Sequence, residues 1–479
     1  MSEVAELNKL HALIPQFESI VGANYVYSGN EEMHKYGRDE TENLHFNPGV
    51  VLLPRTTIEI SEILKICYAE NIHVTPRGAG TGLSGGALPH LGGVVISFER
   101  MNSIIEIDER NLQVTTEPGV ITEVLQNAVK EKGLFYPPDP SSRGSCFIGG
   151  NISANSGGPK AVKYGVVKDY VLNLEVVLAN GDIIWTGANV LKNSTGYNLT
   201  QLIVGSEGTL GLVTKIVLKL LPHPKYELLM LVPFNDLEKA GAAVSAIFRA
   251  GFTPSVLELV EINALKIVGA FVNSTTVTVS EETEAHLLIE VDGNYQETLM
   301  TDMEAISALM EQFDCGEIFF ADDEQQKAEL WKLRRRVAEA VKLAGYTIEE
   351  DTVVPRAELP ALIHGVKKLG LLHDFEVVCY GHAGDGNLHI RIKKPGSIYS
   401  LNNVVVIPIL NELFKLVKSL GGTISGEHGI GLIQKQYMPI LFDDATLNLM
   451  RGIKNVFDPK HILNSGKIFD RIDTVSRQS

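Results

Sequence analysis

The chain has 479 residues, of which 44% are hydrophobic and 21% are charged, and its formal net charge is −16. A chain of this length is too long to fold around a single hydrophobic core, so we expect two or three domains. Its composition is that of an ordinary globular protein, which argues against disorder. The acidic charge excludes nucleic acid as an expected partner, because such a surface cannot replace the counterions of phosphate.

The cysteines and the N-terminus favour a reduced, cytoplasmic setting. The four cysteines lie far apart, without Cys-x-x-Cys spacing and without the pattern of a disulfide framework. The N-terminal segment MSEVAELNKLHALIPQF lacks the basic and apolar regions of a signal peptide. No apolar run approaches the roughly 18 residues of a membrane span, so we expect no transmembrane segment.

The first half of the chain has the pattern of short strands mixed with helices. Thr56 and Glu59 form a capping box that begins a helix, and Asn180-Gly181 is a strong two-residue hairpin signal. The expected strands cover residues 50–53, 72–75, 94–97, 104–107, 114–117, 172–178 and 183–185, and a second helix covers about 122–132. The block from about 46 to 222 is therefore α+β, without the repeated strand–helix unit of a dinucleotide fold.

The pattern changes near residues 222–224. Strands at 227–232, 286–290 and 375–379 alternate with long amphipathic helices near 236–250, 299–312 and 324–344. Two further helices, about 403–420 and 443–455, flank the segment ISGEHGIG. The ending FDPKHILNSGKIF is loop-like, and we expect it to return to the first domain.

Glycine-rich, polar loops fall where strands of the first half should end. Residues 78–93 contain seven glycines. This loop is neither a P-loop, because no Gly-Lys-Ser/Thr ends it, nor a Rossmann fingerprint, because no helix clearly follows it. Alone, it could equally be a flexible turn. Together with 137–165, the following hairpin and 202–215, it indicates backbone close to one large ligand with phosphates, a ribose and a flat ring.

Four motifs resemble a known family. PRGAGTGLSGG, DPSS…IGGNISANSGG, KNSTGYNLTQLIVGSEGTLG and the late FDP…LNSGK look like the FAD-binding domain of the vanillyl-alcohol oxidase type. The resemblance covers about residues 36–469, and in particular it is to the branch of D-lactate dehydrogenases, the glycolate oxidase flavin subunit and D-2-hydroxyglutarate dehydrogenase. It implies an α+β fold with four parts: an N-terminal helical segment (1–45), a two-part FAD-binding domain (46–225), a substrate domain with an antiparallel sheet and helices (226–402), and a C-terminal helical segment that completes the metal and flavin site (403–479).

The resemblance also implies which residues bind FAD. They are Pro76, Arg77, Gly78, Ala79, Gly80, Thr81, Gly82 and Ser84 at the pyrophosphate, Asp139, Ser142, Gly149, Gly150, Asn155 and Gly157 along the flavin, Glu207 and Ile216 beside the adenosine, and Asn464 near the isoalloxazine. Residues 76–89 contain no histidine that could tether FAD, so noncovalent FAD is favoured over a tether at Cys146. Phe147, where a threonine is more usual, departs from the family pattern.

The segment YGHAGDGNLHIRI contains a second set of candidates. His382 and His389 stand at the two ends of the turn sequence 384–387 and could converge on one ion. In SGEHGIG, flanking glycines let Glu427 and His428 reach the same cavity. Two imidazoles and one carboxylate suit zinc or another first-row ion such as manganese, although a lone histidine is more often a core or surface residue. The family pattern GHxGDGNxH with EHG implies His382, His389 and Glu427 as metal ligands and His428 as the base.

This set predicts the oxidation of a 2-hydroxy acid. The acid would chelate the ion, His428 would take the hydroxyl proton, and hydride would pass from C2 to flavin N5. Arg334 projects from the apolar face of its helix, where a guanidinium needs an anion. That anion is either a structural partner or the substrate carboxylate, and the resemblance implies the carboxylate. Arg391 shares a strand face with His389 and could supply another cation.

The identity of the acid rests on a few positions. Ala338 and Glu349 stand where relatives that bind a second carboxylate have threonine and lysine, which disfavours D-2-hydroxyglutarate. The segment EEDTVVPRAELP, with Arg356, is more similar to the lactate and glycolate members. We therefore expect a small monocarboxylate, D-lactate or glycolate, and the D hand comes from the resemblance alone.

Two rival functions remain at this point. Alkyl-glycerone-phosphate synthases share this FAD fold without net redox change, but no basic amphipathic segment supports that function here. An accessory flavin subunit of a larger complex is the other rival, and an intact set of metal ligands and base argues against it. Because no motif indicates a second redox centre, we expect an electron-transfer flavoprotein, an iron–sulfur subunit or a quinone as electron acceptor. A homodimer is a possible assembly.

Overall fold

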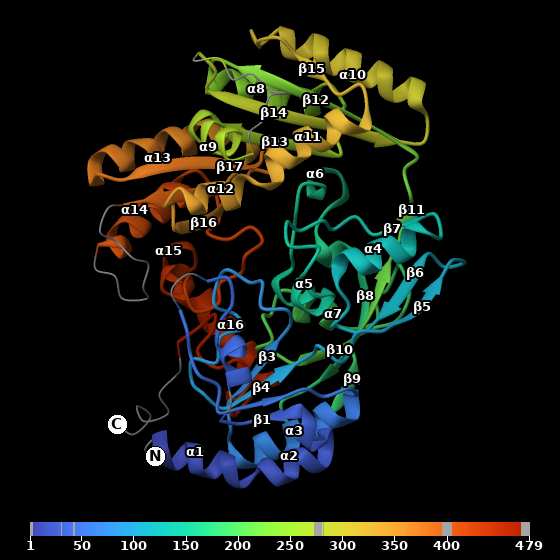
Figure 1. The fold of residues 1–479 in the computed structure, drawn as a ribbon, viewed down its shortest axis with the longest axis vertical. Coiled ribbons are helices and arrows are strands. Elements are labelled where there is room, and N and C mark those ends of the chain that lie inside the picture. The colour runs from blue at the N-terminus through green and yellow to red at the C-terminus, as the bar shows by residue number, and fades with distance from the viewer. Residues whose placement is uncertain are drawn as a thin grey trace.

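A computed structural model of the chain describes residues 3–29, 31–41, 44–272, 280, 282–394 and 405–470. Figure 1 shows two halves: the lower one is built mainly from the N-terminal part of the chain, and the upper one from residues after β11. The described part of the chain mixes helices and sheets throughout, which confirms the expected α+β class. None of its helices is long and apolar enough to cross a membrane.

The lower half contains a small sheet with the strand order β1-β2-β4-β3, in which β2, β4 and β3 run parallel. Its strands are β1 (Val26–Tyr27), β2 (Val50–Leu52), β3 (Val74–Arg77) and β4 (Val94–Ser97). The helices α1 (Glu3–Ala12), α2 (Ile14–Val21) and α3 (Thr57–Glu70) lie beside it, and buried side chains of α2 and α3 join its core. The predicted cap begins α3, because the Thr56 side chain accepts a hydrogen bond from the Glu59 amide at 3.2 Å.

A second sheet in this half is antiparallel, with the order β5-β6-β10-β8-β9. Its strands are β5 (Ile104–Asp108), β6 (Gln113–Thr116), β8 (Val171–Val177), β9 (Ile183–Trp185) and β10 (Leu212–Lys219). The predicted Asn180-Gly181 hairpin joins β8 to β9, and Gly181 takes the positive φ of 86° that such a turn requires. The neighbouring elements are α4 (Thr122–Lys130), β7 (Leu134–Phe135), α5 (Ile148–Ala154), α6 (Ala161–Tyr164), α7 (Leu199–Ile203) and β11 (Leu221–Pro222).

The upper half is organised by a seven-stranded antiparallel sheet, as the resemblance predicted for the second domain. In spatial order its strands are β15 (Phe319–Phe320), β12 (Tyr226–Phe234), β14 (Ala285–Gly293), β13 (Val256–Glu261), β17 (Glu376–His382), β18 (Asn387–Lys393) and β16 (Ile348–Val353). Helices cover both faces of this sheet. Alternate residues of one strand, β12, therefore belong to two different hydrophobic cores. Met230 and Val232 point into one core, whereas Leu229 and Leu231 point into another.

Among the described residues, four helices cover one face of this sheet and three cover parts of the other. The first group is α8 (Leu237–Arg249), α10 (Gln296–Glu311), α13 (Leu359–His373) and α14 (Val406–Ser419). The second group is α9 (Ile262–Val272), α11 (Glu324–Arg335) and α12 (Val337–Leu343). Sequence analysis predicted one helix over 324–344, which was wrong: the helix breaks at Arg336, whose ψ is 0°. The apolar residues Val337 and Val341, in the part after the break, are nevertheless fully buried.

The C-terminal part of the chain crosses from the upper half to the lower half (Figure 1). After α15 (Met438–Leu441) and α16 (Asp444–Phe457), the chain reaches the first sheet, where Leu463 forms a parallel bridge with Val74. The amide of Asn464 also donates to the carbonyl of Val74 at 2.8 Å. The expected return of the C-terminal loop to the first domain is therefore confirmed. Residues 403 and 404, where the predicted helix 403–420 starts, lie outside the described residues.

Candidate active site

The structure brings His382, His389 and Glu427 together. His382 ends β17, and His389 lies in β18, the next strand of the same hairpin. The Glu427 Oε1 atom lies 3.6 Å from His382 Nε2 and 3.7 Å from His389 Nε2. All three side chains present one ligand atom within 4.8 Å of the other two. The predicted convergence of the two histidines at the ends of one turn is thus visible in the hairpin geometry.

This cluster, His382–His389–Glu427, fits a divalent metal ion. Tetrahedral zinc with bonds of ~2.0–2.1 Å separates its ligand atoms by about 3.3 Å, close to the observed spacings. The buried Glu427 Oε2 atom has no hydrogen-bond partner among the described residues, and an unpaired buried carboxylate oxygen is costly in a site without a ligand. Imidazole and carboxylate are also the donors that zinc and manganese accept. We therefore treat the cluster as a candidate metal site.

The three side chains of the cluster differ in how their surroundings shift their pKa values. Burial lowers the pKa of His389 to about 4 in spite of the nearby carboxylates, so the ring is neutral at pH 7, as a ligand must be. Burial would raise the pKa of Glu427, but hydrogen bonding and positive charge from His382 lower it to about 2. Burial would lower the pKa of His382 as well, yet the carboxylates of Glu258 and Glu427 raise it well above its usual value.

Asp351 holds the loop that carries Glu427 and His428. Its Oδ2 atom accepts hydrogen bonds from the amides of Gly426 (2.8 Å), Glu427 (2.7 Å) and His428 (2.9 Å). Its Oδ1 atom accepts one from Asn387 Nδ2 at 2.6 Å, which ties the loop to the turn between the two histidines. Asp351 lies in β16, a strand that the sequence analysis did not identify.

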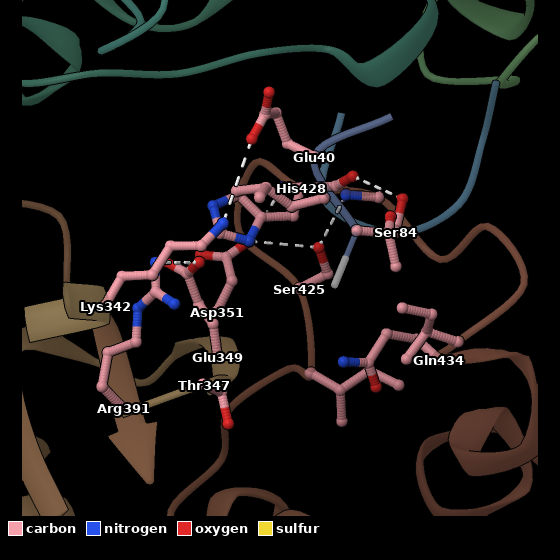
Figure 2. A pocket seen from close by; sticks show the side chains of 15 residues that line it. Glu40, Ser84, Lys342, Thr347, Glu349, Asp351, Arg391, Ser425, His428 and Gln434 are labelled. Carbon is pink, nitrogen blue, oxygen red and sulfur yellow. Dashed lines mark hydrogen bonds and ion pairs between the residues drawn. The ribbon is translucent and has the colours of Figure 1, made fainter. Parts of the chain in front are cut away.

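His428 faces a cleft of about 580 Å³. The ring of His428 stacks on that of His389, with centroids 5.4 Å apart, so the candidate base lies directly beside the metal cluster. Burial would lower the pKa of His428, but the carboxylates of Asp351, Glu349 and Glu427 raise it. The residues that line the cleft, shown in Figure 2, are Glu40, Thr41, Leu83, Ser84, Lys342, Thr347, Glu349, Asp351, Arg391, Ile424, Ser425, His428, Gly429, Ile433 and Gln434.

Of the three predicted substrate-binding arginines, only Arg391 lines this cleft. It stands opposite Glu349 in the β16–β18 ladder, and its Nη2 atom lies 2.5 Å from Glu349 Oε2. Its predicted position on the face of His389 is confirmed, because the alternate residues of β18 point into the core on the other side. Arg356 lies elsewhere: its guanidinium packs 3.8 Å over the ring centroid of Phe248.

Arg334 is buried, as predicted, but its anion belongs to the protein. Its Nε atom donates to Glu258 Oε2 at 2.5 Å, and the other oxygen, Glu258 Oε1, lies 2.6 Å from His382 Nδ1. Glu258 itself was missed by the sequence analysis. The signal was available, however, because a glutamate inside the apolar strand pattern VLELVE needs a buried partner.

The glycine-rich segments predicted to bind FAD converge in the lower half. A Cβ at Gly78 would lie 3.8 Å from the backbone of Gly150, and one at Gly205 would lie 3.4 Å from Asn155 Cβ. At Gly82 and Gly150 an added Cβ would meet no atom within 4 Å. Close backbone segments with open space at their glycines form a cradle that fits a large flat cofactor with phosphates.

Gly157 links this cradle to the metal cluster. A Cβ at this position would lie 2.9 Å from Glu427 Oε2. The side chain of Ser84 donates to the carbonyl of His428 at 2.9 Å, so the first glycine-rich loop also contacts the loop of the candidate base. The cofactor cradle and the metal cluster are therefore neighbours in space, although their residues are far apart in the sequence.

Several other predicted FAD residues have partners within the protein. Gly149 approaches Pro118, whose carbonyl accepts its amide at 2.8 Å. The guanidinium of Arg77 donates to the carbonyl of Lys35 at 3.1 Å, and Ile216 is fully buried in the core of the five-stranded sheet. The carbonyl of Ser142 accepts the amides of the turn at residues 145–146.

Glu207 connects the first domain to the loop that follows His428. Glu207 accepts the amides of Ile430 and Gly431 at 2.7 and 2.8 Å, and its carbonyl accepts Asn464 Nδ2 at 2.7 Å. The two contacts of the Glu207 side chain fix the loop that follows His428 against the first domain. Asp139 instead pairs with Arg143 within the first domain, at 2.8 Å. The remaining predicted positions of the first loop, Pro76, Ala79, Gly80 and Thr81, lie at the end of β3 and in the turn that follows it.

Comparison with known proteins gives consistent matches. Residues 48–187 match the family described as "FAD binding domain", and residues 223–468 match "FAD linked oxidases, C-terminal domain". The chain is 42% identical to the glycolate oxidase subunit GlcD of Bacillus subtilis over 91% of this chain and 92% of the relative. It is 36% identical to D-lactate dehydrogenase of Anaerostipes hadrus, with 92% of each protein covered.

Two further comparisons extend this set. The chain is 35% identical to D-2-hydroxyglutarate dehydrogenase of Xanthomonas citri pv. viticola, with 92% of this chain and 93% of the relative covered. Among solved structures, p-cresol methylhydroxylase superposes with a TM-score of 0.79 at 18% identity, with 98% of each chain covered. The likeness to this solved structure concerns the fold alone, which is the predicted vanillyl-alcohol oxidase type.

Proposed function

This chain belongs to the FAD-linked oxidases, and from that premise we propose that it oxidises a small D-2-hydroxy acid to the 2-oxo acid with noncovalent FAD and a divalent metal. The observation that carries the proposal is one juxtaposition: His428, which lines the cleft, stacks on His389 of a cluster with metal-ligand spacing. That cluster borders the glycine cradle through Gly157. Relatives named for glycolate, D-lactate and D-2-hydroxyglutarate support the substrate class.

In this proposal, bound FAD supplies the acceptor for the hydride from C2 of the acid. The metal, which His382, His389 and Glu427 would hold, supplies a Lewis acid that lowers the pKa of the substrate hydroxyl. His428 then accepts the hydroxyl proton, and the carboxylates around it stabilise the imidazolium that results. Asp351 keeps the backbone amides of Glu427 and His428 in register, so that ligand and base keep a fixed separation.

The charges of the cleft favour an acid with one carboxylate. Its charged lining consists of three carboxylates, Glu40, Glu349 and Asp351, two basic side chains, Lys342 and Arg391, and the base His428. Arg391 is paired with Glu349, so a second carboxylate on the substrate would meet no excess of positive charge there. Glycolate and D-lactate fit this lining better than D-2-hydroxyglutarate, which remains the second candidate because of the relative that bears its name.

The acceptor, assembly and location belong to the same proposal. Reduced flavin must pass its electrons on, and we infer an electron-transfer flavoprotein, an iron–sulfur subunit or a quinone as the acceptor. A homodimer and a cytoplasmic location complete the picture expected from the sequence. None of these three features is needed for the chemistry at His428.

Anaerobic flavin absorbance of the purified protein tests the proposed substrate class. D- and L-lactate, glycolate and D-2-hydroxyglutarate are added in turn, before and after treatment with a chelator and re-addition of zinc or manganese. We expect bleaching by D-lactate or glycolate that is lost with chelator and restored by metal. A flavin that no hydroxy acid bleaches would contradict the proposal, and bleaching by D-2-hydroxyglutarate alone would replace the first candidate with the second.

A further inference from the structure

Glu258 is a buried carboxylate at the edge of the metal cluster. It lies in β13 and has no exposed surface. Its strand neighbours Leu257 and Leu259 point into the core on the other side of the sheet, so Glu258 points toward the cluster. An unpaired carboxylate at such a depth would be strongly destabilising. Its contacts therefore show what it does there.

Each oxygen of Glu258 has a different partner. Oε2 accepts the Nε–H of Arg334 at 2.5 Å, and Oε1 lies 2.6 Å from Nδ1 of His382. Arg334 is itself buried, with 7% of its surface exposed. The guanidinium thus balances the carboxylate charge, and the carboxylate is left to bind the histidine.

The contact with Glu258 fixes which nitrogen of His382 carries a proton. A carboxylate only accepts hydrogen bonds, so Nδ1 must donate. The neutral ring then has its lone pair on Nε2, the atom that lies 3.6 Å from Glu427 Oε1 inside the cluster. Without this partner the ring could place its proton on either nitrogen, and it could also rotate.

We propose that Glu258, with Arg334 as its counterion, is a positioning residue that holds His382 in the tautomer and orientation needed to bind the metal. The proposal rests on the proposed metal site and goes beyond it, because it gives Glu258 and its counterion Arg334 a role in the support of a metal ligand. It also explains why a strand with the pattern of a buried core carries a charged residue at this position.

Binding of cobalt(II) to the FAD-loaded, chelator-treated protein tests the proposal without any turnover. Cobalt gives a visible spectrum that reports its coordination, and a competing chelating dye gives its dissociation constant. In Glu258→Gln a single acceptor oxygen must serve two donors, so either Arg334 or His382 loses its partner. We expect the dissociation constant to rise about 10–100-fold, the usual cost of losing the partner of a metal-bound histidine.

Glu290→Gln is the matched control. Glu290 is a buried glutamate of the neighbouring strand β14, 1% exposed and paired with Lys160 at 2.7 Å. It shares the sheet and the burial of Glu258 but has no contact with His382. We expect its cobalt affinity and spectrum to equal those of the wild type, even if its melting temperature falls.

A second variant, Glu258→Asp, tests the proposal in case Glu258→Gln folds poorly. Glu258→Asp keeps the charge for Arg334 but is one methylene shorter, so it should fold and still bind cobalt more weakly. In the wild type, the exchangeable Nδ1 proton of His382 should give a hyperfine-shifted NMR signal that weakens in this variant. Wild-type affinity in both Glu258 variants would overturn the proposal. A wild type that binds no cobalt would contradict the proposed metal site itself.

Discussion

Replacing Asp351 with asparagine should loosen the loop of Glu427 and His428. The carboxylate accepts three backbone amides of this loop, from Gly426, Glu427 and His428, at 2.7–2.9 Å. A hydrogen bond to a charged acceptor contributes about 1.5–3 kcal/mol and a neutral one about 0.5–1.5 kcal/mol. Loss of the charge should therefore cost roughly 1 kcal/mol for each bond and about 3 kcal/mol in total.

For a domain of about 150–250 residues, this loss corresponds to a fall in melting temperature of roughly 6–12 °C. The asparagine amide would also face the amide of Asn387, which now donates to Asp351 at 2.6 Å. Thermal unfolding of the FAD-loaded protein at pH 7.5 measures the effect, and turnover should fall with it because ligand and base lose their register. Asp292→Asn, which alters a buried carboxylate bonded to Lys163 and Tyr164, should destabilise the protein without that loss of turnover.

The effect of Asp351→Asn should depend on pH. Burial would raise the pKa of Asp351, but charge from His428 and hydrogen bonds from the Glu427 amide and Asn387 hold it well below its usual value. A depressed pKa stabilises the folded state above the unfolded value of about 3.9, and this contribution is lost as the pH falls. The difference in melting temperature should therefore shrink below about pH 4. A difference of less than about 2 °C at pH 7.5 would refute the reasoning.

Three further substitutions test other contacts. Gly157→Ala places a methyl group 2.9 Å from Glu427 Oε2, so metal affinity should fall while FAD is retained; unchanged affinity, measured by titration, would contradict this. Gly150→Leu extends into open space of the glycine cradle, so the protein should fold but be purified without flavin absorbance, and full FAD occupancy would show that the cradle is elsewhere. Arg335→Ala removes a partly exposed ion pair with Asp139 at 3.6 Å, and chemical denaturation should show a loss below about 1 kcal/mol.

The parts of the site that lie on one turn could be predicted from the sequence. His382 and His389 flank a glycine turn between two strands. A two-stranded hairpin therefore brings their side chains close together. The helix with Arg334 was predictable in the same way, because its apolar spacing placed the guanidinium on the buried face. Local sequence patterns are enough to predict the position of a site residue when that position depends only on residues close to it in the chain.

The supporting residues could not be predicted, because they depend on the order of strands in the sheet. Glu258 reaches His382 only because β13 pairs with β17, which follows it by more than a hundred residues. Asp351 reaches the loop of His428 only because β16 is placed beside β18 and next to residue 425. Arg391 was expected to offer a cation, but the same pairing sets it opposite Glu349 and neutralises much of its charge.

Single-turnover reduction of the flavin tests the central claim, that His428 removes the hydroxyl proton of an acid held at the metal cluster. The acid that bleaches the flavin fastest is mixed anaerobically with the wild type and with His428→Asn, in unlabelled form and with deuterium at C2. We predict a primary isotope effect in the wild type and a reduction rate that falls roughly 10²–10⁴-fold in the variant, with FAD and metal content unchanged. Flavin reduction at the wild-type rate in His428→Asn would contradict the account.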